Sequence, residues 1–150
     1  MLEELDPIDR KIVELLLENC RISNAEIARK VHLSRVAVRE RIQNLVQKGI
    51  IQEFTVVLNA SALGYNIAAF FDIEVQPDKL ELVGHELARQ KQVNIVYHMT
   101  GPSSLHVHAY LKDSEHLAAF MRDHIYSIPG VQRVNSCLLL RRFKSVLSIR

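Results

Sequence analysis

Residues 23–49 carry the sequence SNAEIARKVHLSRVAVRERIQNLVQKG, which predicts two helices joined by a tight turn. Ser23 and Glu26 have the spacing of a capping box, in which each side chain accepts a hydrogen bond from a backbone amide near the other. The first helix can run for only about two turns before the next capping serine, Ser34, opens the second. Gly49 stands where a helix C-terminus favours a left-handed residue.

The second of these helices separates an apolar face from a polar one. Val38, Ile42 and Leu45 recur at helical spacing and form its inward stripe. At about 100° per residue, the opposite face holds Val36, Glu40, Gln43 and Gln47, with Arg35 and Arg39 beside it. Arginine and glutamine can form paired hydrogen bonds with guanine and adenine in the major groove, and a serine at a helix N-terminus suits a phosphate. The predicted DNA-contacting residues are Ser34, Arg35, Val36, Arg39, Glu40 and Gln43.

Another helix is predicted upstream. Asp6 can accept hydrogen bonds from free backbone amides, and Pro7 suits the first helical position. Asn19 is expected to end this helix in the left-handed conformation. The apolar residues between them recur at helical spacing, namely Ile8, Ile12, Leu15 and Leu16. Together the three helices predict a DNA-binding domain over residues 1–58, with the helix-turn-helix at about 23–47.

Charge is distributed unevenly along a chain whose net charge is only +2. Residues 1–20 carry two basic and six acidic side chains, whereas residues 21–48 carry seven basic and two acidic ones. The basic excess of the second stretch is what a phosphate-binding surface requires. The alternative is an ordinary three-helix bundle whose basic face is merely solvated. Arg41 lies nearer the core edge, where packing or an internal ion pair explains it at least as well as DNA contact does.

The overall composition is that of a folded globular protein. Of the 150 residues, 48% are hydrophobic and 24% are charged, which is enough apolar side chain to build cores. The N-terminus is acidic and no stretch is apolar for long enough to cross a bilayer, so we expect a cytoplasmic protein without a membrane partner. Cys20 and Cys137 lie far apart and outside any CxxC pair, which indicates reduced, buried thiols, and no cofactor is expected.

A second domain is predicted after a strand at Ile50–Leu58. Residues 59–66 are expected to be a linker, residues 67–142 the second domain and residues 143–150 a C-terminal tail. The first predicted elements of this domain are a strand through Phe71, Ile73 and Val75 and a helix capped by Asp78. Two strands follow, at Val93–Met99 and Leu105–Leu111. The last two elements are a helix with Leu117, Phe120 and Met121 and a strand at Val131–Arg142. The order βαββαβ is the ferredoxin-like arrangement, with both helices on one face of an antiparallel sheet, so the predicted fold class is α+β.

The other face of this sheet is predicted to meet a second subunit. Leu138 and Leu140 alternate with Cys137 and Leu139, so the last strand is apolar on both sides. A homodimer also suits the first domain, because two recognition helices related by a two-fold axis read half-sites about 34 Å apart.

The chain resembles the Lrp/AsnC family of regulators over nearly its whole length. The residues that carry the resemblance are Leu5-Asp6, Ile8-Asp9, Arg21 to Asn24, Leu33-Ser34, Arg41-Ile42, Gly49 to Ile51, Leu63-Gly64, Thr100-Gly101 and Ile128 to Val131. The resemblance implies a winged-type helix-turn-helix on a dimer that often assembles further into octamers. It also implies small-molecule ligands, usually amino acids, bound between dimers near the Thr-Gly turn.

The turn departs from the family pattern, in which acidic residues commonly follow the Thr-Gly pair. A carboxylate is the natural partner of a ligand's ammonium group, whereas this chain supplies only hydroxyls. Threonines of the family's last strand are also replaced, by Val134 and Ser136. The candidate ligand pocket is therefore Thr100, Gly101, Pro102, Ser103, Ser104, Val134 and Ser136, and it holds either another ligand or none.

Two other functions remain open at this point. Architectural DNA compaction without a ligand is favoured somewhat by the missing acidic residues. An enzyme resembling the siroheme decarboxylases, which share this architecture, would need chemistry from Ser103, Ser104 and His106, but a turn of this composition is usually only a turn.

Histidines suggest one further possibility. If Met99 pairs with Leu105, then His98 lies opposite His106, with His108 on the same face. No cysteine or carboxylate completes a metal site, so no metal is expected, and polar residues at a subunit interface are the simpler interpretation. A pH-sensitive interface is a further alternative.

Overall fold

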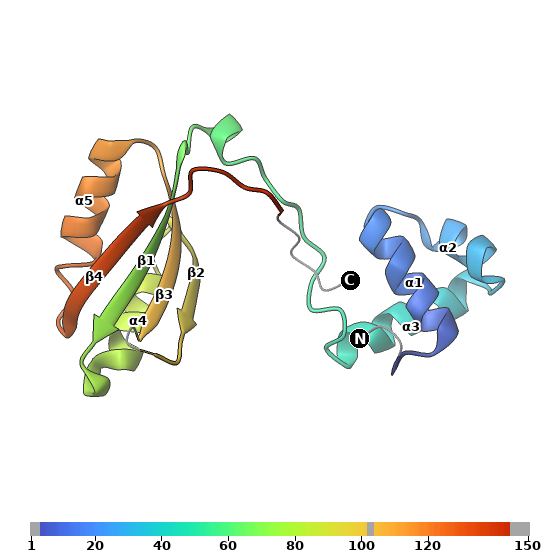
Figure 1. Ribbon diagram of the computed structural model, residues 1–150. Helices are drawn as coiled ribbons and strands as arrows, with labels where there is room; N and C mark the ends of the chain where they lie inside the picture. Colours follow the sequence, from blue (N-terminus) through green and yellow to red (C-terminus); the bar gives the residue numbers. More distant parts are fainter. Residues whose placement is uncertain (1–3, 102–103, 145–150) are drawn as a thin grey trace. The chain divides into compact units, whose positions relative to one another are not determined.

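The computed structural model describes residues 4–101 and 104–144, which are drawn in colour in Figure 1. They divide into two compact units, one ending at Val57 and the other spanning Leu58–Phe143. Among the described residues, no helix is both long and apolar enough to span a bilayer.

The first unit contains three helices, α1 (Pro7–Glu18), α2 (Asn24–Val31) and α3 (Arg35–Gln47). Each begins at a side chain that accepts hydrogen bonds from the first free backbone amides. Asp6 accepts from the amides of Ile8 and Asp9, Ser23 from that of Glu26, and Ser34 from that of Ala37. The three predicted helix starts are therefore confirmed.

A small apolar core holds these helices together. Its buried members are Ile12, Val13, Leu15, Ile27, Ala28, Val38 and Leu45. Val38 and Leu45 are almost fully buried, and Ile42 of the same stripe packs against the cluster while partly exposed. The inward stripe predicted for α3 is thus confirmed, and it leaves the opposite side of α3 in solvent.

The ends of these helices follow the sequence less closely. Gly49 is left-handed at φ 69°, as predicted. Asn19 is extended at φ −149° rather than left-handed, and its side chain accepts a hydrogen bond from the amide of Arg21. His32 takes the left-handed position at the end of α2, with φ 55°.

The prediction of a strand at Ile50–Leu58 is wrong for the single chain. Residues 52–58 are extended, but their backbone groups form no ladder with any other described residue. A β-strand forms only where a neighbouring strand accepts and donates its backbone hydrogen bonds, and this segment has no such neighbour among the described residues. Val56, Val57 and Leu58 consequently remain 76%, 72% and 68% exposed.

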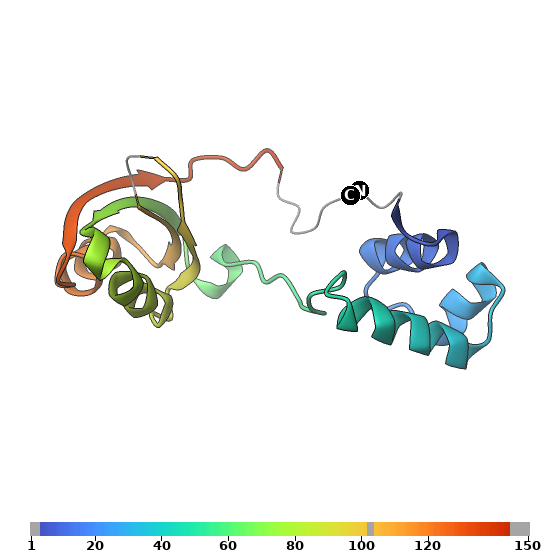
Figure 2. The same cartoon turned by 90° about the horizontal axis from the view of Figure 1, so that it is seen from below.

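The second unit is a four-stranded antiparallel sheet with two helices. Its elements are β1 (Ile67–Val75), α4 (Leu80–Ala88), β2 (Val93–His98), β3 (Leu105–Leu111), α5 (Ser114–His124) and β4 (Val131–Leu138). The strand order is β2-β3-β1-β4, and Figure 2 shows the curvature of the sheet. The predicted α+β class and βαββαβ order are confirmed.

Alternation along the strands separates the two faces of this sheet. Phe71, Ile73 and Val107 point to the face covered by α4 and α5 and are fully buried with Val83, Leu87 and Phe120. We call the opposite side the open face. Its residues, given by the strand register, are Ala68, Phe70, Asp72, Glu74, Ile95, Tyr97, His106, His108, Tyr110, Arg133, Asn135 and Cys137.

Three details of the sequence-based description are corrected. β4 ends at Leu138 rather than at Arg142. Its partner strand β1 begins at Ile67, so the last backbone hydrogen bond between the two strands is the one that the amide of Leu139 donates to Ala68. Asp78 does not cap a helix; it lies in a single 3-10 turn, and α4 starts at Leu80 without a side-chain cap. Cys20 and Cys137 are exposed thiols, not buried ones.

Candidate nucleic-acid interface and small-molecule site

The residues that were predicted from the sequence to contact DNA lie together on the outward side of α3. Ser34, Arg35, Val36, Arg39, Glu40 and Gln43 are all exposed, and we call this set the outward face of α3. Val36 is 66% exposed although it is apolar. An exposed valine next to arginines offers an apolar contact of the kind that a thymine methyl group accepts.

Arginines of this region divide into paired and unpaired ones. Arg41 donates to Asp6 at 3.1 Å and to Asp9 at 2.8 Å, which joins α3 to the start of α1. The hydrogen bond to Asp9 is the main cause that raises the pKa of Arg41. The pKa of Asp6 is lowered, chiefly by the backbone amide of Asp9 and also by Arg41. Arg41 therefore forms the internal ion pair that the sequence left as an alternative.

In contrast, three other arginines have free guanidinium groups. Within residues 4–101 and 104–144, Arg29, Arg35 and Arg39 make no ion pair or side-chain hydrogen bond, and all three are exposed. Uncompensated cations on one small unit attract a polyanion, which releases its condensed counterions when it binds.

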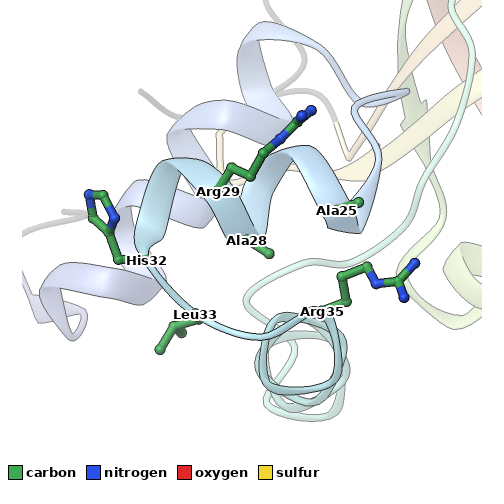
Figure 3. A pocket seen from close by; sticks show the side chains of 6 residues that line it. All are labelled: Ala25, Ala28, Arg29, His32, Leu33 and Arg35. Carbon is green, nitrogen blue, oxygen red and sulfur yellow. The ribbon is translucent and has the colours of Figure 1, made fainter.

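An open hollow lies between α2 and the beginning of α3 (Figure 3). It has a volume of about 650 Å³ and is lined by Ala25, Ala28, Arg29, His32, Leu33 and Arg35. Figure 3 shows Arg29 extending from α2 and Arg35 from the start of α3. None of the described residues that line this α2–α3 hollow carries a carboxylate, and two of them are arginines, so the hollow is suited to an anion.

Sequence reasoning missed Arg29 and His32 as site residues. The charge excess of residues 21–48 included Arg29, but only the packing of α2 against α3 shows that it shares a hollow with Arg35. The sequence gives no indication that His32 belongs to the site. Its place in the hollow depends on a left-handed backbone conformation, which is uncommon at a residue other than glycine.

The candidate ligand pocket is only partly assembled in the single chain. Thr100 and Gly101 are exposed at the turn after β2, and Pro102 and Ser103 lie outside the described residues. Ser104 is half-buried, because its hydroxyl accepts from the amide of Val75 at 3.4 Å and its own amide donates to Ile73 at 3.0 Å.

The other two pocket candidates lie on β4, on the opposite edge of β1 from Ser104. Val134 pairs with Ile73, and Ser136 pairs with Phe71. Both residues therefore point to the helix-covered side of the sheet, where Val134 packs against the core while Ser136 stays exposed. Ile73 has Ser104 as a hydrogen-bonded neighbour on one flank and Val134 on the other, so these two candidates lie on either side of the same residue of β1.

A small hollow of this unit lies elsewhere, between α4 and the strands β2 and β3. Its volume is about 240 Å³, and it is lined by Leu80, Glu81, Gly84, His85, Ala88, Val96, His98 and Leu105. This hollow could not be predicted from the sequence, because it depends on how α4 packs on the two strands.

The register proposed for the histidines is wrong by one residue. His98 pairs with Leu105, and Met99 donates its amide to Ser104. Since successive residues alternate between faces, this shift places His98 on the opposite face from His106. No three His, Cys, Asp or Glu side chains gather as a metal site in the part of the chain that the structure describes. His106 and His108 do share the open face, with ring centroids 4.8 Å apart.

Family profiles match both units. The profile of the AsnC-type helix-turn-helix domain matches residues 5–46, and that of the Lrp/AsnC ligand binding domain matches residues 68–148.

Relatives align along almost the full length. An uncharacterized HTH-type transcriptional regulator of Pyrococcus furiosus is 36% identical over 141 residues, which are 94% of this chain and 95% of the relative. The HTH-type transcriptional regulator FL11 of the same organism is 35% identical over 145 residues, which are 97% of this chain and 95% of FL11.

Solved structures have the same architecture. A transcriptional regulator from Neisseria meningitidis, crystallised as a complex with L-Met, superposes with a TM-score of 0.90 at 26% identity, covering 97% of this chain and 96% of that one. The structure of E. coli AsnC gives a TM-score of 0.88 at 23% identity, covering 95% and 96%.

Proposed function

Because the chain belongs to the Lrp/AsnC family of DNA-binding transcriptional regulators, we propose that the outward face of α3 contacts the bases of its operator. Arg39 and Gln43 are one turn apart on this face and project into solvent, as major-groove contact requires. The observation that carries the assignment is that Arg35 and Arg39 are exposed and unpaired among the described residues while Arg41 of the same helix is held inward by carboxylates.

The α2–α3 hollow supplies the phosphate contact in this proposal. Arg29 and Arg35 flank it, and the small side chains of Ala25 and Ala28 leave room for a backbone phosphate. Contacts of this kind position a protein on the duplex, while base contacts select the sequence. The hollow therefore adds affinity and orientation, and α3 adds sequence preference.

Footprinting on the DNA upstream of the protein's own gene tests the proposal. A sequence-specific regulator protects discrete half-sites, about one helical turn apart when two subunits bind together. Uniform coverage would favour the second candidate, a ligand-independent architectural protein, for which the hydroxyls at the Thr100 turn in place of carboxylates are the supporting observation.

Substitutions at Ser34 distinguish its role as the cap of α3 from its proposed contact with a DNA phosphate. Ser34→Ala removes the cap of α3 and is expected to lower the free energy of unfolding by about 1 kcal/mol. Ser34→Asp restores an equally good cap but places a negative charge beside the phosphate, so it should leave stability within about 0.5 kcal/mol of wild type and still weaken DNA binding. Urea denaturation and a DNA titration measure the two effects.

A control for added charge is Ser61→Asp, an exposed serine in the other unit. It should change neither stability nor DNA affinity appreciably. Full DNA affinity of Ser34→Asp would exclude a phosphate near Ser34.

Self-association through the open face completes the DNA-binding form in this proposal. The open face bears the half-buried aromatic ring of Phe70 and the 53% exposed ring of Tyr97, and no described helix covers it. Two copies related by a two-fold axis would bury these rings against each other. We propose a homodimer as the basic unit, with an octamer as a further assembly.

A small-molecule effector is proposed for the region of Thr100, Gly101 and Ser104. The Neisseria relative was crystallised with L-Met, so an amino acid is the first ligand to test. Because a ligand that binds only the folded state raises thermal stability by mass action, a melting-temperature screen with amino acids detects it.

The replacement Ser104→Asp is expected to create or strengthen amino-acid binding. The hydroxyl of Ser104 accepts from the amide of Val75, and an aspartate can keep that bond with one oxygen and offer the other to an ammonium group. Calorimetry with a panel of amino acids measures the gain, with Asn94→Asp, at an exposed position of β2, as the charge-matched control. An absence of binding heat for every amino acid would contradict the prediction.

A further inference from the structure

The open face carries a cluster of histidine and aromatic rings on its two central strands. His106 and His108 lie on β3, and Phe70 and Asp72 lie opposite them on β1. Phe70 contacts both imidazoles, with its ring centroid 4.5 Å from that of His108 and 6.2 Å from that of His106. The cluster is therefore central to the surface through which we propose that two copies meet.

The two imidazoles have different electrostatic surroundings. Nδ1 of His106 lies 2.6 Å from the carboxylate of Asp72, within hydrogen-bond distance. Among the described residues, His108 has ring contacts only, with Phe70, His106 and, at 6.5 Å, Tyr97. A proton gained by His108 therefore adds a charge without a partner.

The remaining charged groups of the open face do not face His108. Glu74 lies 3.8 Å from Arg133, and Tyr110 accepts a hydrogen bond from Arg142 at 3.2 Å. Cys137 of β4 pairs with Phe70, which separates this thiol from His108 in the sheet. The helices α4 and α5 pack on the other face and contribute no charge here.

We propose that protonation of His108 releases a second copy of this chain from the open face, so that self-association weakens as the pH falls below neutrality. The proposal rests on the homodimer proposed above and adds a regulatory input to it. The direction follows from burial. The pKa of His108 is lowered by burial and further by the neighbouring His106, and a second copy would exclude more water from the ring.

Linkage determines the pH window. Because the dimer holds His108 neutral more strongly than the monomer does, the monomer binds more protons, and acid favours dissociation. The dimer is fully stable above the pKa that His108 has in the monomer, which burial and His106 already place below the ordinary histidine value of about 6.5, and it is destabilised progressively below that pKa. Two symmetry-related imidazoles titrate together, so the dissociation constant can rise by up to about 100-fold per pH unit.

Sedimentation equilibrium of the full chain at about pH 8 and about pH 5.5 tests the proposal, since histidine changes its charge between these values. The wild-type dissociation constant should rise at least ~10-fold in acid. His108→Gln, which cannot take up a proton, should show less than ~3-fold change. His85→Gln removes a histidine that is 76% exposed on α4, and it should behave as wild type.

Two results would overturn the inference. One is a dimer of equal strength at both pH values; the other is the same acid sensitivity in His108→Gln as in wild type. His108→Phe serves as a second variant if glutamine prevents folding, because it preserves the ring contacts without a titratable group. A chain that stays monomeric even at about pH 8 would contradict the proposed homodimer itself, which distinguishes the two failures.

Discussion

Arg39→Ala is expected to weaken binding to the operator by about 1–3 kcal/mol and to relax the base preference at one position of each half-site. The guanidinium of Arg39 is exposed, has no partner among the described residues and stands one turn from Gln43. Its removal deletes a base contact without exposing a buried group, so the free energy of unfolding should change by less than about 0.5 kcal/mol. Titrations against the operator and single-base variants of it measure both effects.

A matched control for Arg39→Ala is Arg89→Ala. Arg89 follows the last residue of α4 in the other unit, and its side chain is 73% exposed and pairs with Glu86 at 2.8 Å. It should leave affinity and base preference as in wild type. If Arg39→Ala weakened all sequences equally and lowered the salt dependence, Arg39 would contact a phosphate rather than a base.

Leu45→Ala should destabilise the helix-turn-helix unit by about 2–5 kcal/mol and abolish DNA binding. Leu45 is 1% exposed and packs with Val38 and Ile12 in the core on which the orientation of α3 depends. Because the second unit has a core of its own, the variant should still self-associate. Urea denaturation followed by circular dichroism measures the first effect, and sedimentation measures the second.

The neighbouring Val46→Ala is the control for Leu45→Ala. Val46 is 42% exposed, so its truncation should cost less than about 1 kcal/mol. Joint loss of DNA binding and self-association in Leu45→Ala would mean that the two units unfold as one cooperative body.

Short-range signals predicted most of the fold. The caps Asp6, Ser23 and Ser34 act within three residues, so they can be recognised from the sequence with no knowledge of packing. The alternation of Phe71, Ile73 and Val75 likewise predicted the buried face of β1. The outward face of α3 followed from the inward stripe, because a helix has a fixed angle per residue.

Features that depend on a partner segment could not be predicted. The register of β2 against β3, in which His98 pairs with Leu105, depends on how the two strands meet, and the pattern of either strand alone does not determine it. The end of β4 depends on where β1 begins. The α2–α3 hollow depends on the approach of two helices, so Arg29 could not be assigned to it from sequence alone.

The exposed segment 52–58 bears on the fate of an isolated copy in a cell. Proteases and chaperones select accessible, extended apolar chain, and this stretch presents Phe54, Val56 and Leu58 with free amides beside them. We expect limited proteolysis of an isolated copy to cut first within this stretch.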